Sequence, residues 1–188
     1  MHDIPSRPHW LEEEAVYLGV LTARRVKPLS RLEYPVGPQV LGIFDTLGLM
    51  TAPVTRFAQN GAQVTHTILS RDRSLIRHYL VEFDTTIIQG EVPAVVRAEA
   101  RHFGYPACCA EAYINQPYAP NGLAGEDQTL LFHHACPGCK KTPRLIPLYR
   151  SALAETRHIL SSYTRQPSFA AAYIAVGVSG LLHSPLTP

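Results

Sequence analysis

Four cysteines in two tight pairs place the strongest constraint on how this chain can fold. The pairs are Cys108-Cys109 and Cys136-Pro137-Gly138-Cys139. The 26 residues between Cys109 and Cys136 leave enough chain for the second pair to return to the first. A fold that brings the pairs together creates one site with four sulfurs, and that shared site is our central hypothesis.

The spacing and the cellular context of the cysteines favour a bound metal or cluster over disulfides. The first ten residues lack the basic region and apolar run of a secretory signal, so we expect a cytoplasmic protein with reduced thiols. Cys-x-x-Cys is metal-ligand spacing. The same spacing serves thiol redox chemistry, but the strand and helix typical of a thioredoxin-like motif are not predicted around it. A metal-free thiol redox protein is therefore the third interpretation.

The adjacency of Cys108 and Cys109 favours a [4Fe-4S] cluster over zinc. Structural zinc sites usually take two ligands from a turn with two to four residues between them, so adjacent cysteines would chelate one tetrahedral zinc awkwardly. In a cluster, neighbouring thiolates can bind different iron atoms, or three cysteines can hold the cluster while one iron is open to substrate. Zinc bound by cysteine and histidine stays open as the alternative cofactor.

Titratable residues near the cysteines are candidates for catalysis. His133, His134 and Glu111 are the candidate catalytic residues, because each could transfer a proton if it reaches the site. The structural alternative for the two histidines is that one faces solvent while the other caps or packs, since neighbouring side chains seldom point at one target.

A basic group follows the second cysteine pair and provides candidates for substrate binding. Its members are Lys140, Lys141 and Arg144. Positive charge there would lower a thiol pKa and could hold an anionic substrate or a nucleic-acid backbone. The ordinary alternative is a solvated helix start, because a few charges do not define a nucleic-acid surface.

These features lead to two main functional hypotheses. The first is an enzyme whose cysteine-ligated iron-sulfur cluster acts on a small, anionic or sulfur-containing substrate at an open iron. The alternative is a zinc-stabilised module that binds nucleic acid or protein. Motifs for P-loop nucleotide hydrolysis, serine esterase chemistry and zincin proteolysis are absent from the sequence. The substrate, the reaction and the oligomeric state stay open.

Hydrophobic periodicity predicts a mainly α, single helical domain over residues 1–188, or an α+β domain with a small sheet. A hydrophobic fraction of 46% with 16 prolines fits a globular chain of many short elements. We expect helices over residues 10–25, 39–50, 70–83, 91–103, 108–114 and 142–162, and strands over 63–69 and 85–89. Residues 115–128 read as a loop, and 169–182 as a buried helix too short to span a membrane. The cysteine-rich metal-binding region covers residues 103–150.

Residues 103–153 resemble a small family of uncharacterised prokaryotic proteins. The resemblance rests on the motif Gly104-Tyr105-Pro106-x-Cys108-Cys109 and on the later Cys136-x-x-Cys139, which follows His133. That family has no known activity, so the resemblance implies a shared cysteine site and nothing about substrate. The first hundred residues show no resemblance to a known family.

Overall fold

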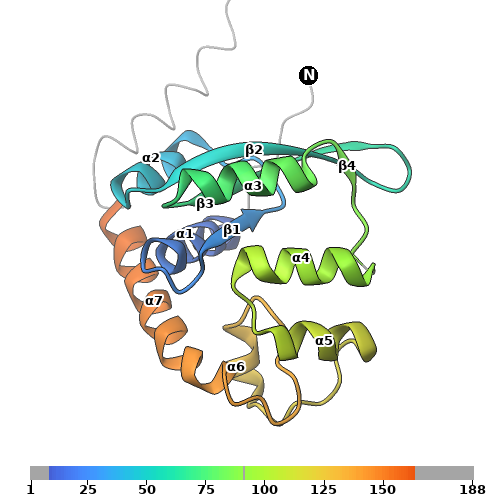
Figure 1. Ribbon diagram of the computed structural model, residues 1–188. Coiled ribbons are helices and arrows are strands. Elements are labelled where there is room, and N and C mark those ends of the chain that lie inside the picture. The colour runs from blue at the N-terminus through green and yellow to red at the C-terminus, as the bar shows by residue number, and fades with distance from the viewer. Residues whose placement is uncertain (1–8, 91, 164–188) are drawn as a thin grey trace, which may run out of the picture.

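The structure is a computed structural model that describes residues 9–90 and 92–163, and its fold is α+β (Figure 1). The described helices are α1 (His9–Ala23), α2 (Pro38–Thr46), α3 (Arg73–Phe83), α4 (Pro93–Phe103), α5 (Ala107–Asn115), α6 (Gly125–Thr129) and α7 (Thr142–Tyr163). The described strands are β1 (Leu29–Leu32), β2 (Met50–Phe57), β3 (Gln63–Ser70) and β4 (Thr86–Ile87). A four-stranded sheet makes α+β the accurate class, so the mainly α alternative holds only roughly.

The sheet has the order β1-β3-β2-β4 and separates two layers of helices. β3 pairs antiparallel with both β1 and β2, and β4 adds a short parallel pair to β2. Because neighbouring side chains on a strand point to opposite faces, Ile68 packs with α3 and α4 while Leu69 packs with α1 and α2. The sheet is therefore covered on both faces.

Helix α7 connects the sheet layer to the cysteine region (Figure 1). Its buried residues Tyr149 and Ala152 pack against Val16 and Val20 of α1 in one apolar cluster. The Tyr17 hydroxyl reaches the main-chain oxygens of Leu130, at 3.1 Å, and Tyr149, at 3.2 Å. These contacts hold the loop before α7, and with it the second cysteine pair, against the N-terminal helix.

Strand β2 is the main element that the sequence pattern missed. Pro53 interrupts it, and a proline argues against an interior strand because it cannot donate a main-chain hydrogen bond. β4 pairs only with Arg56 and Phe57, so Pro53 lies where the outer side of β2 has no described strand beside it. An open edge tolerates the missing N–H group. The predicted strand over 85–89 is correspondingly short, only Thr86–Ile87.

Other predicted boundaries need smaller corrections. Asp72, not Ser70, caps α3: its carboxylate accepts a hydrogen bond from the Ser74 N–H at 2.8 Å. The helix expected over 39–50 ends at Thr46, because β2 begins at Met50. The helix expected over 169–182 lies outside the described residues. Among the helices that the structure describes, none is both long and apolar enough to cross a membrane.

Candidate metal centre

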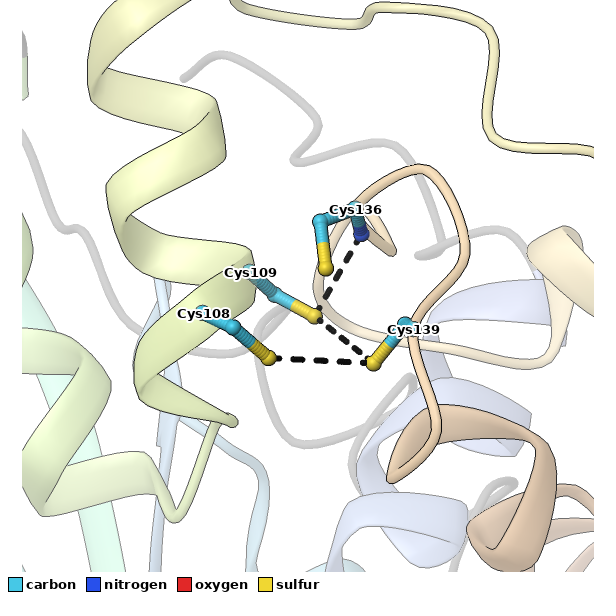
Figure 2. A group of neighbouring side chains, drawn as sticks. All are labelled: Cys108, Cys109, Cys136 and Cys139. Carbon is cyan, nitrogen blue, oxygen red and sulfur yellow. Dashed lines mark hydrogen bonds between the residues drawn. The ribbon is translucent and has the colours of Figure 1, made fainter.

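The four cysteine sulfurs converge on one point between α5 and the turn before α7 (Figure 2). All four Sγ atoms lie within 4.8 Å of one another. The Sγ atom of Cys139 is 3.8 Å from that of Cys108 and 3.5 Å from that of Cys109. The fold therefore unites the two pairs, as the spacing predicts, and the set of donors fits a metal ion.

The vicinal pair reaches this point because the chain reverses sharply between α4 and α5. Gly104 ends α4 with φ 71°, the left-handed conformation expected of it, and the Tyr105 N–H donates back to the Ala100 carbonyl at 2.8 Å. A Cβ atom on Gly104 would lie 2.6 Å from the Pro28 side chain, so only glycine fits this approach. The reversal brings the first turn of α5, with both cysteines, to the second pair.

A tight turn presents the second pair. The Cys139 N–H donates to the Cys136 carbonyl at 3.1 Å, which closes a four-residue turn. Pro137 occupies the second position, which suits its fixed φ, and Gly138 supplies φ 65° at the third. The Cys136 N–H also donates to the Cys109 sulfur at 3.4 Å. The turn thus aims its sulfurs and one N–H group at the first pair.

Thr142 is a site residue that the sequence reasoning missed. Its buried hydroxyl oxygen lies 3.3 Å from the Cys139 sulfur, 3.5 Å from the Cys109 sulfur and 3.0 Å from His133 Nε2. The Thr142 N–H donates to the Cys139 sulfur at 3.3 Å. The available signal was its position as the first residue of a predicted helix, three residues after a cysteine, where free N–H groups face outward.

The free thiols differ in acidity because their surroundings differ. Burial raises the pKa of Cys139, but hydrogen bonding with Thr142 and the Lys141 main chain outweighs it and lowers the pKa to about 6. Burial, and then hydrogen bonding with Cys108 and Cys109, raises the pKa of Cys136 to about 12. Burial also raises the pKa of Cys109. Four crowded thiols do not all ionise readily unless a cation joins them.

The three candidate catalytic residues point in different directions. His133 Nε2 contacts Thr142, whereas His134 Nε2 lies 2.7 Å from the Ala119 carbonyl oxygen. The Glu111 carboxylate accepts two hydrogen bonds from the Arg97 guanidinium, at 2.6 and 2.8 Å, on the surface. His133 is thus joined to the cysteines through Thr142, while the structure gives Glu111 and His134 other partners. Their catalytic roles stay predictions.

The basic group at the start of α7 lies at the surface. All three residues are exposed: Lys140, Lys141 and Arg144. Arg150, further along α7, donates to the Asp127 carboxylate at 2.6 Å. Their role in binding an anionic partner stays a prediction.

A cavity of about 860 Å³ adjoins the cysteine centre, and the sequence pattern did not indicate it. Cys109 and His133 line the cavity together with residues distant in sequence, among them Lys27, Arg31 and Tyr105. Lys27 is 2% exposed and Arg31 is paired with Glu99. A local sequence motif cannot predict this cavity, because its lining residues come together only through packing.

Comparisons with known proteins identified no relative of this chain. No family model, curated protein or solved structure matches the chain. The resemblance of residues 103–153 to an uncharacterised family therefore stays an expectation, and the function must be argued from the site itself.

Proposed function

We propose that the chain is a zinc-stabilised binding module in which Cys108, Cys109, Cys136 and Cys139 hold one tetrahedral ion. The observation that carries the proposal is the compactness of the sulfur group, with all four Sγ atoms within 4.8 Å. Thiolates around one zinc ion stand about 3.8 Å apart, because each Zn–S bond is about 2.3 Å long. The separations of 3.5 and 3.8 Å from Cys139 match that spacing.

The adjacency of Cys108 and Cys109 is no obstacle to a shared ion in this geometry. Both sulfurs lie within 4 Å of the Cys139 sulfur, at 3.8 and 3.5 Å, although the two residues are neighbours on one helical turn. Four protein ligands occupy every coordination position of a tetrahedral ion, which is typical of a structural zinc site. When bound, the ion supplies charge neutralisation and a cross-link between α5 and α7. That cross-link would fix the wall of the adjoining cavity.

An iron-sulfur cluster is the second candidate, and the exposure of Cys108 is the observation that favours it. An exposed thiol at a helix start can move outward, and a cluster needs wider ligand separation because its thiolates bind different irons. On this alternative, three cysteines would hold the cluster and Cys108 or a histidine would face a small substrate. The basic residues Lys140 and Lys141 would then lie beside that substrate.

Anaerobic purification, metal analysis and a visible absorption spectrum distinguish the candidates. We expect colourless protein with one zinc per chain, bound with four thiolates. Brown protein containing iron and sulfide would overturn the zinc proposal in favour of the cluster. Metal-free protein whose thiols form a reversible disulfide would overturn both and support a thiol redox protein.

A further inference from the structure

The cavity beside the cysteine centre encloses a lysine in an unusual setting. Lys27 is one of three lysines in the chain, and it lines the cavity while being only 2% exposed. A volume of about 860 Å³ lies within the range of pockets that bind small molecules. The cavity is large enough for a ligand to approach the Lys27 amine.

The Lys27 amine is surrounded by aromatic rings and has no carboxylate partner within ion-pair distance among the described residues. Its Nζ atom lies 4.2 Å from the ring centre of Tyr105 and 5.4 Å from that of Phe103. It donates one hydrogen bond, to the Phe103 carbonyl at 3.2 Å, at the end of α4. A cation at a helix C-terminus is favourable, and this contact satisfies one N–H group of Lys27. The other N–H groups have no hydrogen-bond acceptor among the described residues.

His133 provides a second polar atom at the same place. Its ring centre is 5.1 Å from that of Tyr105, and its Nδ1 atom is buried without a hydrogen-bond partner among the described residues. If the sulfurs are metal-bound thiolates, they can only accept, so the Thr142 hydroxyl donates to sulfur and accepts from His133 Nε2. The proton of the neutral His133 ring then lies on Nε2, and Nδ1 keeps a lone pair. This assignment rests on the proposed function.

We propose that the cavity binds a small aldehyde or ketone and that Lys27 forms an imine with it, with His133 Nδ1 acting as the proton carrier. The Nζ lone pair attacks the carbonyl carbon, and the carbonyl π electrons move to oxygen. Nδ1 takes one amine proton and delivers it to that oxygen. The second amine proton leaves with the hydroxyl group as water while the C=N bond forms. Amine and carbonyl thus give imine and one water, without an oxidant or reductant.

The surroundings of Lys27 favour the uncharged amine that this step requires. Burial, and then the positive charge of Arg31, lowers the pKa of Lys27 to about 7. The aromatic rings and the Phe103 carbonyl favour the ammonium and oppose that effect. A lysine desolvated in this way keeps part of its amine uncharged near neutral pH, which is how lysine nucleophiles are activated.

The other two lysines provide an internal control for the test. Lys140 and Lys141 are both exposed, so the competition takes place within one chain. The metal-loaded full-length protein is treated at pH 7 with propanal and cyanoborohydride, which reduces any imine to a secondary amine, and the labelled peptides are quantified by mass spectrometry. We expect Lys27 to be labelled roughly tenfold faster or more, since one pKa unit is a tenfold change in free amine. Labelling of Lys27 no faster than of the exposed lysines would overturn the proposal.

Two substitutions test the part assigned to His133. His133→Gln can still reach Thr142 but lacks Nδ1, and we expect labelling of Lys27 to slow about tenfold or more. His133→Asn is the matched control, because its amide oxygen lies near the position of Nδ1, and we expect a smaller loss. Equal loss in both variants, or loss in neither, would overturn the role of Nδ1.

Metal analysis of the same samples separates this inference from the proposed function. Zinc-loaded protein that shows no preference for Lys27 overturns the inference and leaves the zinc proposal standing. Selective labelling of Lys27 in protein without zinc supports imine formation at Lys27 but overturns the zinc proposal and, with it, the argument for the His133 tautomer. Guanidinium should abolish the selectivity, because unfolding gives all three lysines the same aqueous surroundings.

Discussion

The cysteine centre and the Lys27 cavity share helix α5, yet they arrange their polar groups in opposite ways. In the centre, four identical donors lie within 4.8 Å of one another. In the cavity, one amine lies among aromatic rings, 4.2 Å from the nearest ring centre. Crowded thiolates repel and are stabilised by a cation, whereas a buried amine without a carboxylate partner is stabilised by losing its charge. Cys109 belongs to the cysteine centre and also lines the cavity, so the two sites adjoin at this residue.

Substitution of a cysteine ligand should have the largest effect. We expect Cys109→Ser to lose most of its zinc and to lower the free energy of unfolding by about 4 kcal/mol or more, a size associated with loss of a metal. Metal analysis and urea denaturation measure the two effects. Ala107, an exposed residue in the same helical turn, provides the matched control, and Ala107→Ser should retain zinc. Full zinc content in Cys109→Ser would show that the ion does not need the buried cysteine.

A pair of glycine substitutions compares the chain reversal before α5 with the turn of the second cysteine pair. Gly104 and Gly138 both have positive φ, at 71° and 65°, but only at Gly104 would an added Cβ atom meet a close neighbour, the Pro28 side chain at 2.6 Å. We expect Gly138→Ala to cost about 1 kcal/mol for the left-handed conformation, and Gly104→Ala about 3 kcal/mol because the neighbour must also move. Urea denaturation of zinc-loaded protein measures both. Equal losses would mean that Pro28 yields without cost.

The charge of Lys27 should give a smaller, pH-dependent effect. Its pKa is about 7 in the fold, whereas an unfolded lysine has a pKa of about 10.4. Between these values the unfolded chain binds more protons, so this residue makes stability rise with pH, and the cost of burying the charge is fully present below pH 7. Lys27→Met removes this contribution.

Urea denaturation of both proteins at pH 7 and pH 9 tests that prediction. The wild type should gain stability relative to Lys27→Met as the pH rises, because thiol titration is common to the two proteins and cancels in the comparison. A constant difference between them would indicate that Lys27 keeps its charge in the fold, held by the rings and the Phe103 carbonyl.

Removal of the Glu111 charge should have the smallest effect. Its ion pair with Arg97 is exposed on the surface, with roughly half of each side chain accessible, and exposed pairs contribute little to stability. We expect Glu111→Gln to leave zinc content, thermal midpoint and Lys27 labelling unchanged. A marked loss of labelling would instead revive Glu111 as a catalytic residue.

Much of the helical part of the fold could be predicted from local patterns. Helix α4 begins at Pro93 and ends before Gly104. The proline and the glycine mark these boundaries through the conformations that their own backbones allow. Strand β2 could not be predicted in this way, because Pro53 is acceptable only at an open edge. Whether an edge is open depends on where β4 lies, which is a property of the whole sheet.

The candidate site divides in the same manner. The cysteine pairs identified the donors and their spacing along the chain, but not the separation of the four sulfurs in space, on which our zinc proposal depends. Thr142 follows Cys139 by three residues, but its contacts with Cys109 and His133 depend on how the start of α7 packs against the rest of the site. The histidines looked equivalent in sequence, yet one ring contacts Thr142 and the other the Ala119 carbonyl.

The sequence by itself determined the four sulfur donors, the turn that carries two of them and the glycine that ends α4. These features depend on the chemistry of each residue and on the conformations open to its own backbone. The tertiary structure decided that the sulfurs meet, and that Lys27, far from them in sequence, is buried beside Tyr105 and His133. Burial and convergence arise from packing between distant segments, and no local pattern encodes the electrostatic surroundings that packing creates.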